Sequence, residues 1–224
     1  MAGQSLRFVA CSTNVYWNRT GRERARTRWQ TIFNGVDMDR YTFTSCVDED
    51  APLIFLGRIE PCKGVHNAIA IAKEADRRLV IAGNVPAEGQ NYFEGRICPL
   101  LDGNQIRYIG PVNDTQKNSL LGSAAALLMP IEWDEPFGIV MAEALACGTP
   151  VIAFPRGSVN EVIVDGVTGF ICRSINEAAR AVDRLDRIDR VAARADCEAR
   201  FSSTVITDAY ENLCWELTQQ CAGY

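Results

Sequence analysis

Histidine is almost absent from this sequence, and cysteine lacks the spacing of a metal site. The 224 residues contain one histidine, His66, and nine cysteines, none of which forms a Cys-x-x-Cys pair. Structural zinc sites draw on closely spaced Cys and His residues, so we expect no metal centre. The cysteines are expected to be reduced thiols, several of them on apolar faces.

Long hydrophobic runs and an N-terminal leader are missing as well. The longest apolar run, 124–131, covers less than half of the ~20 residues that a membrane-spanning helix needs. The first residues, MAGQSLRFVACS, lack the basic start and apolar centre of a signal peptide. We therefore expect a cytoplasmic protein.

Positive charge is not in excess. Lys and Arg number 23 against 28 Asp and Glu, a net charge of −5, whereas nucleic-acid-binding domains are usually strongly basic. We expect no nucleic-acid partner. One stretch is rich in arginine, and we favour a solvated helix there over contact with a membrane surface or an acidic partner. Its arginines are Arg19, Arg22, Arg24, Arg26 and Arg28.

The composition is that of an ordinary globular protein, with 47% hydrophobic and 23% charged residues. Short, continuous apolar runs alternate with amphipathic stretches, as in strands buried on both faces and separated by helices. This order predicts an α/β fold with a doubly wound parallel sheet. The expected strands are 6–11, 53–57, 79–83, 106–110, 126–129, 151–154 and 169–172, and the expected helices are 65–75, 113–123, 136–147, 176–185 and 205–219.

The N-terminal residues follow a different pattern. A strand leads into the Arg-rich stretch, and the polar, acidic stretch 42–52 comes before the first buried strand. We place a domain boundary near residue 50, with the main domain over 51–224. Near the C-terminus, the stretch 180–200 mixes Arg and Asp at helical spacing, which predicts a solvated, ion-paired helix.

Two loops after predicted strands carry charged residues. In GRIEPCKG, Gly57 permits a sharp turn, and Arg58 and Lys63 lie beside the start of a helix. Such cations, together with helix amides, suit a diphosphate, although two exposed residues in a turn would look the same. In EPFGIVMAE, Pro136 is expected to begin a helix, which would put Glu135 and Glu143 about 12 Å apart. An N-capping Glu and a helix-face Glu are the alternatives.

Two further loops contain glycines that permit close approach of the backbone. Gly83 ends one predicted strand, where an ordinary strand-end glycine is the alternative, and Gly157 lies in the loop after another, where a plain connector is the alternative. The carboxyl ends of parallel strands meet at one edge of a sheet, which is where such sheets bind ligands. We therefore expect these loops to form one site.

The motifs in this order resemble the nucleotide-sugar-binding half of the family-4 glycosyltransferases of the GT-B fold. The resemblance rests on LIFLGRIEPCKG, LVIAGN, MPIEWDEPFGIVMAEALACGTPVIAF and RGSVNEVIVDGVTGFIC. It implies a retaining hexosyltransferase that uses UDP-, GDP- or ADP-linked sugars without a cofactor or a metal. The DxD string Asp37-Met38-Asp39 falls in the family's linker, so we do not assign it to a metal.

The resemblance also implies roles for single residues. Arg58 and Lys63 match diphosphate ligands, Glu135 matches the donor-sugar contact, and Glu143 matches the ribose ligand. Ile109 falls where the backbone meets the base. Backbone amides that meet the sugar and phosphate correspond to Phe137, Gly138 and Ile139.

The family's acceptor-binding half is otherwise missing from the sequence, and residues 1–50 resemble only its end and the interdomain linker. The pattern also differs at Asn84 and Arg156, which leaves the donor open. Three hypotheses remain: a transferase whose acceptor half is a partner chain, a binding module for a nucleotide or nucleotide sugar, and a structural remnant that binds a protein. A nucleotide-sugar epimerase shares the architecture, but PFG between the two glutamates favours a transferase by resemblance.

Three other features permit more than one interpretation. The expected helix 205–219 has an apolar side (Val205, Ala209, Leu213, Leu217), from which we predict a homo-oligomer. We expect His66 to be a core or surface residue rather than a catalytic one. Trp133 suits either a contact with the sugar or the core.

Overall fold

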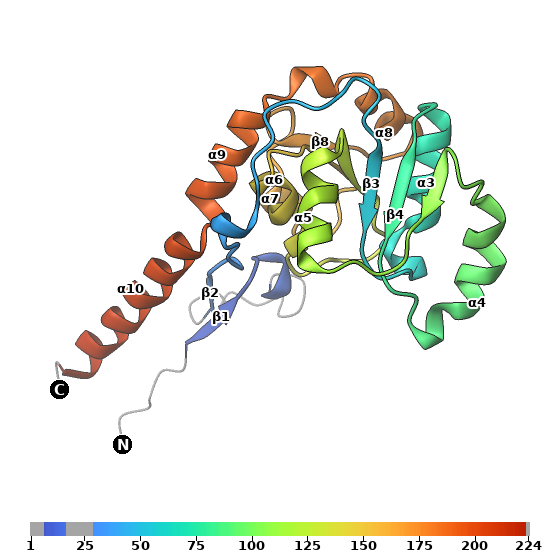
Figure 1. The fold of residues 1–224 in the computed structure, drawn as a ribbon. Helices are drawn as coiled ribbons and strands as arrows, with labels where there is room; N and C mark the ends of the chain where they lie inside the picture. The colour runs from blue at the N-terminus through green and yellow to red at the C-terminus, as the bar shows by residue number, and fades with distance from the viewer. Residues whose placement is uncertain (1–6, 17–28, 223–224) are drawn as a thin grey trace.

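The computed structural model describes residues 7–16 and 29–222. The arginine stretch 19–28 falls outside these residues. The predicted α/β fold with a doubly wound parallel sheet is confirmed. One parallel sheet has the strand order β5-β4-β3-β6-β7-β8 and helices on both faces (Figure 1). Its strands are β3 (Leu53–Leu56), β4 (Leu79–Ala82), β5 (Ile106–Tyr108), β6 (Ala126–Met129), β7 (Val151–Ala153) and β8 (Gly169–Ile171).

The buried side chains form two clusters, one on each face of the sheet. Successive side chains of a strand point to opposite faces, so Leu53 and Phe55 join one cluster and Ile54 joins the other. The first cluster contains residues of α3 (Val65–Glu74) and α8 (Ile175–Val182). The second contains residues of α5 (Asp114–Ser123), α6 (Ile139–Ala146), α7 (Val159–Val162) and α9 (Arg190–Phe201).

The strand order reverses between β3 and β6. The chain adds β4 and β5 on one side of β3, then crosses to β6 on its other side, where Leu53 pairs with Ala126. In open α/β sheets the loops that leave the carboxyl ends of such a strand pair diverge and open a crevice. The predicted charged loops follow these two strands.

The N-terminal residues form a small sheet of their own. Parallel strands β1 (Phe8–Ala10) and β2 (Trp29–Thr31) pair Phe8 with Trp29, whose rings stack 4.9 Å apart. No strand was predicted over 29–31. Three residues are too few to show a strand period, and pairing with β1 decides their conformation.

Residues 32–47 lie against the main domain. The amide of Val36 donates to the carbonyl of Phe201 at 2.7 Å, and the amide of Ser203 donates to the carbonyl of Val36 at 2.9 Å. The amide of Thr44 donates to the carbonyl of Cys147 at 3.1 Å. A boundary near residue 50 remains a prediction, with this segment attached to the surface of the larger domain.

The stretch 180–200 differs from its prediction. It is not one solvated helix: α8 ends at Val182, and α9 begins at Arg190 after a short turn. Arg190 is buried, and its guanidinium donates to the carbonyls of Thr44, Gly122 and Ala124. Helix α9 packs against the core through buried Ala193, Cys197 and Phe201. The prediction considered the Arg and Asp spacing and overlooked this apolar face.

Two other helical segments differ from the prediction. The turns between β4 and β5 were not predicted; they comprise α4 (Gln90–Tyr92), a π-helical turn Phe93–Ile97 and short 3-10 turns. The C-terminal helix α10 (Ser203–Ala222) extends away from the sheet (Figure 1). Of its expected apolar side, Leu213 is buried and Val205 is exposed; self-association remains a prediction. None of the helices in 7–16 and 29–222 is long and apolar enough to cross a membrane.

Candidate functional site

The loop after β3 is held against the loop after β4. Gly57 donates its amide to the carbonyl of Ala82, and Ile59 donates to the carbonyl of Asn84, both at 3.0 Å. Gly83 has φ +148°, and a Cβ there would lie 1.8 Å from the carbonyl oxygen of Gly57. Gly83 is therefore needed for close packing of these two loops. Its predicted contact with a ligand remains a prediction.

The same loop then directs Lys63 toward β6. The 3-10 turn Pro61–Lys63 ends at Gly64, which has φ +74°. A Cβ on Gly64 would lie 2.0 Å from the carbonyl oxygen of Pro130, so only glycine lets this turn approach the end of β6. Lys63 Nζ lies 2.6 Å from Glu135 Oε2 and 4.4 Å from the centre of the Trp133 ring.

Glu135 is fixed by its own loop and by the loop after β7. Its Oε2 accepts hydrogen bonds from Lys63 Nζ and, at 3.0 Å, from Trp133 Nε1. Its carbonyl accepts a bond from the amide of Ser158 at 2.9 Å. Gly157, with φ +58°, packs on the backbone of Glu135, where a Cβ would lie 2.3 Å from Glu135 N. Glycine at 157 therefore lets the loop after β7 pack directly on the backbone of the Glu135 loop.

Helix α6 begins later than predicted. Pro136 is not its first residue: Gly138 is the N-cap, with φ +71° and ψ +62°, and the helix starts at Ile139. The left-handed glycine turns the chain before the helix, so Glu135 and Glu143 do not lie on one continuous helix and the expected rise of about 12 Å does not apply. The first helix amides have no intrahelical acceptors and carry partial positive charge.

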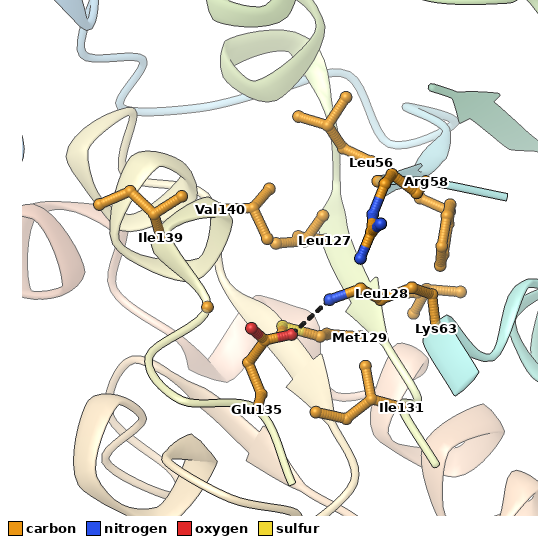
Figure 2. Close-up of a pocket in the computed structure, with 13 residues that line it drawn as sticks. Leu56, Arg58, Lys63, Leu127, Leu128, Met129, Ile131, Glu135, Ile139 and Val140 are labelled. Carbon is orange, nitrogen blue, oxygen red and sulfur yellow. Dashed lines mark hydrogen bonds and ion pairs between the residues drawn. The ribbon is translucent and has the colours of Figure 1, made fainter. Parts of the chain in front are cut away.

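These elements enclose a cavity of about 200 Å³. Figure 2 shows Arg58 and Lys63 on one side of it, with Glu135 and with Ile139 and Val140 of the α6 N-terminus across from them. Lys63 and Glu135 are nearly buried, with 17% and 12% of their side chains exposed. The Arg58 side chain is 53% exposed, and its Nη1 lies 3.0 Å from Glu60 Oε1. The cavity thus combines two cations, a carboxylate and a helix N-terminus.

A second cavity, of about 220 Å³, adjoins the first at Ile139, which lines both. It contains Glu143, whose Oε1 accepts hydrogen bonds of 2.7 Å from Tyr41 Oη and from Lys117 Nζ. Burial and the bond to Glu143 raise the pKa of Tyr41 to about 12. Burial opposes the charge of Lys117, but the Glu143 hydrogen bond and charge raise its pKa above the usual value. Lys117 therefore stays protonated.

Sequence reasoning named both members of the Lys63–Glu135 pair, but of the second cluster it named Glu143 alone. Tyr41 and Lys117 were missed, because one lies in the segment before β3 and the other on α5, a helix that is mostly polar around its circumference. Trp133 is half-buried beside Lys63 and Glu135 and packs against the second core cluster.

Three other residues lie beside or behind the cavities. Ile109, at the end of β5, is 39% exposed and donates its amide to the carbonyl of Ile81. Phe137 is buried, with its ring 5.6 Å from that of Phe201. The predicted backbone contacts of Ile109 and Phe137 with a ligand remain predictions. The His66 ring contacts Tyr92 Oη at 2.7 Å through Nδ1 and Glu132 Oε1 at 3.2 Å through Nε2.

In the part of the chain that the structure describes, no three His, Cys, Asp or Glu side chains gather as metal ligands would. The expected absence of a metal remains a prediction.

Known proteins share both the sequence pattern and the fold. The family model described as "Glycosyl transferases group 1" matches residues 44–198. Glycogen synthase of Mycobacterium tuberculosis (strain CDC 1551 / Oshkosh) is 32% identical over 187 residues, which cover 80% of this chain and 44% of that protein. D-inositol 3-phosphate glycosyltransferase of Mycobacterium bovis (strain BCG / Pasteur 1173P2) is 31% identical over 205 residues, 81% of this chain and 42% of that protein.

Solved structures of other proteins share the fold. Sucrose-phosphate synthase from Thermosynechococcus elongatus superposes with a TM-score of 0.78 at 22% identity, covering 95% of this chain and 58% of that one. Anabaena Alr3699/HepE, solved with UDP and glucose, gives 0.77 at 22% identity, with 95% and 63% covered. The chain spans less than half the length of the two curated relatives. Sequence motifs, sheet topology and family match agree, and the chain belongs to the group 1 glycosyltransferases, with the fold of a GT-B nucleotide-binding half.

Proposed function

We propose that this chain binds a nucleotide-diphosphate sugar and donates its hexosyl group, with retention of configuration, to an acceptor bound elsewhere. One observation carries the proposal. Two carboxylates, Glu135 and Glu143, lie on either side of the α6 N-terminus, each hydrogen-bonded to a lysine, at the point where the strand order reverses. A diphosphate over the helix N-terminus would lie between a sugar near Glu135 and a ribose near Glu143.

The cations of the first cavity have a clear chemical use. When the sugar–phosphate bond breaks, negative charge develops on the leaving diphosphate. Arg58, Lys63 and the amides at the start of α6 would stabilise that charge, and removing one such donor typically lowers the rate about 10²–10³-fold. Lys63 is paired with Glu135 before the donor arrives. Movement of Lys63 to the diphosphate would free Glu135 to accept hydrogen bonds from sugar hydroxyls.

The donor is proposed to be a UDP-, GDP- or ADP-linked sugar. Three of the similar structures contain UDP, UDP with glucose, or UDP-glucose, which makes UDP-glucose the first compound to test. The acceptor half is proposed to come from a separate chain or from further sequence, because this chain spans only 44% and 42% of its curated relatives. We propose that donor binding needs no metal.

Calorimetric titration of the chain with UDP, GDP, ADP and their common sugars tests this proposal. We expect saturable binding of one nucleotide, unchanged by EDTA and weakened about tenfold or more in Lys63→Ala, as expected for loss of a charged hydrogen bond. Lys73→Ala, an exposed lysine at the end of α3, is the matched control and should bind normally.

Two other outcomes would favour the alternatives. Binding without transfer, even when an acceptor half is supplied, would indicate a binding module. Failure of every nucleotide to bind would contradict the proposal and favour a structural, protein-binding role.

A further inference from the structure

Glu143 is held unusually firmly for a carboxylate at the edge of a cavity. In the described part of the chain, its hydrogen bonds from side chains both end on Oε1, one from Tyr41 Oη and one from Lys117 Nζ, each 2.7 Å long. Only 12% of the Glu143 side chain and 19% of the Lys117 side chain are exposed. Because a carboxylate offers about four acceptor positions on two oxygens, Oε2 keeps its capacity to accept from a ligand.

The three side chains come from three separate elements. Glu143 lies in α6, Lys117 in α5, and Tyr41 in the segment that crosses the main domain before β3. Lys117 is itself fixed, since its Nζ also lies 3.3 Å from Asp114 Oδ1 and 5.7 Å from the centre of the Tyr41 ring. A carboxylate bound by two donors from different elements has little freedom to rotate. Glu143 lines the second cavity, so this restraint also limits the directions that its second oxygen can take there.

We propose that Lys117 and Tyr41 are positioning residues, which hold Glu143 so that it accepts hydrogen bonds from the vicinal hydroxyls of the donor's ribose. They thereby set a preference for ribonucleotides over 2′-deoxyribonucleotides. This inference rests on the proposed function, because it assumes that a nucleotide occupies the two adjoining cavities.

A direct role for Lys117 gives a different pattern of binding. If its ammonium group bound a phosphate, its loss would weaken ribonucleotides and deoxyribonucleotides by the same factor. If it acts through Glu143, its loss weakens the ribonucleotide by a larger factor than the 2′-deoxynucleotide, which offers Glu143 only the 3′-hydroxyl. The ratio of the two dissociation constants separates these roles, and a general loosening of the fold would not change that ratio selectively.

The test is titration of UDP, GDP, ADP and their 2′-deoxy counterparts into the wild-type chain, Lys117→Met, Tyr41→Phe and the control Lys73→Met. For the nucleotide that binds, we expect the wild type and Lys73→Met to prefer the ribonucleotide about tenfold or more, the effect of one hydrogen bond to a charged group. Lys117→Met should reduce that preference to about twofold, because the ribonucleotide loses more affinity than its 2′-deoxy counterpart, and Tyr41→Phe should fall between.

Each failure has its own meaning. Absence of nucleotide binding to the wild type would overturn both the proposed function and this inference. Equal wild-type affinity for the two sugars, an unaltered preference in both variants, or an equal loss for both nucleotides in Lys117→Met would overturn the inference alone. If Lys117→Met does not fold, as judged by its urea unfolding curve, Tyr41→Phe decides, since it removes a single oxygen.

Discussion

Replacing Gly157 with alanine is expected to disturb Glu135, although residue 157 carries no side chain. Gly157 has φ +58°, and a Cβ added there would lie 2.3 Å from both the nitrogen and the carbonyl oxygen of Glu135. Atoms of a backbone segment cannot yield as the end of a flexible side chain can. Either residue 157 or the Glu135 loop must move, and the pair between Glu135 and Lys63 moves with it.

The expected cost has two parts. A left-handed alanine costs about 1–2 kcal/mol, partly offset by about 0.4–1 kcal/mol because alanine restricts the unfolded chain. Overpacking adds about 1–3 kcal/mol, so Gly157→Ala should lower the free energy of unfolding by about 2–4 kcal/mol. Gly166 is the matched control: its φ is +76°, and a Cβ there would have no atom within 4 Å. Gly166→Ala should cost about 1 kcal/mol.

Urea unfolding of the two variants measures the difference, with the free energy of unfolding taken from the midpoint at a common slope. We expect Gly157→Ala to unfold at clearly lower urea than Gly166→Ala, and donor affinity to fall in Gly157→Ala only. Equal midpoints for the two variants would show that the contact with Glu135 carries no energy, and the explanation of Gly157 would then be wrong.

Two further predictions concern buried polar groups. Arg190→Met should lower the free energy of unfolding by about 3 kcal/mol, because the guanidinium satisfies Thr44, Gly122, Ala124 and the Thr149 hydroxyl; a urea midpoint equal to that of the wild type would refute this. His66 has a pKa below its usual value because burial disfavours its charged form. The unfolded chain then binds more protons, so stability should decline as the pH falls below about 6.5. Unfolding curves from pH 7 to 5 should show a steeper decline for the wild type than for His66→Gln, and parallel declines would contradict this assignment.

Much of the fold was predictable because parallel strands buried on both faces appear in the sequence as short, continuous apolar runs. Runs such as LIFL and ALLM have no polar side, which distinguishes them from amphipathic helices. The cations of the first cavity were predictable from the topology that these strands imply, which brings the loops after β3 and β6 together. Lys63 and Glu135 prove to be hydrogen-bonded there.

The features that were not predicted depend on tertiary contacts, which the neighbouring residues in the sequence do not indicate. Pro136 suits a helix start, but the left-handed turn at Gly138 delays the helix to Ile139. Arg190 lies among arginines and aspartates of similar pattern, and only the backbone carbonyls around it decide that it is buried. Tyr41 is 102 residues from Glu143, so nothing in either local sequence predicts their contact.

A crystal structure of the chain with UDP-glucose, or with whichever nucleotide sugar binds in titration, tests the central claim most directly. We expect the diphosphate at the N-terminus of α6, within hydrogen-bond distance of Lys63 Nζ and the amides of Ile139 and Val140. The sugar should lie toward Glu135 and the ribose toward Glu143. A nucleotide bound away from both cavities, or one whose diphosphate lies far from α6, would contradict the account.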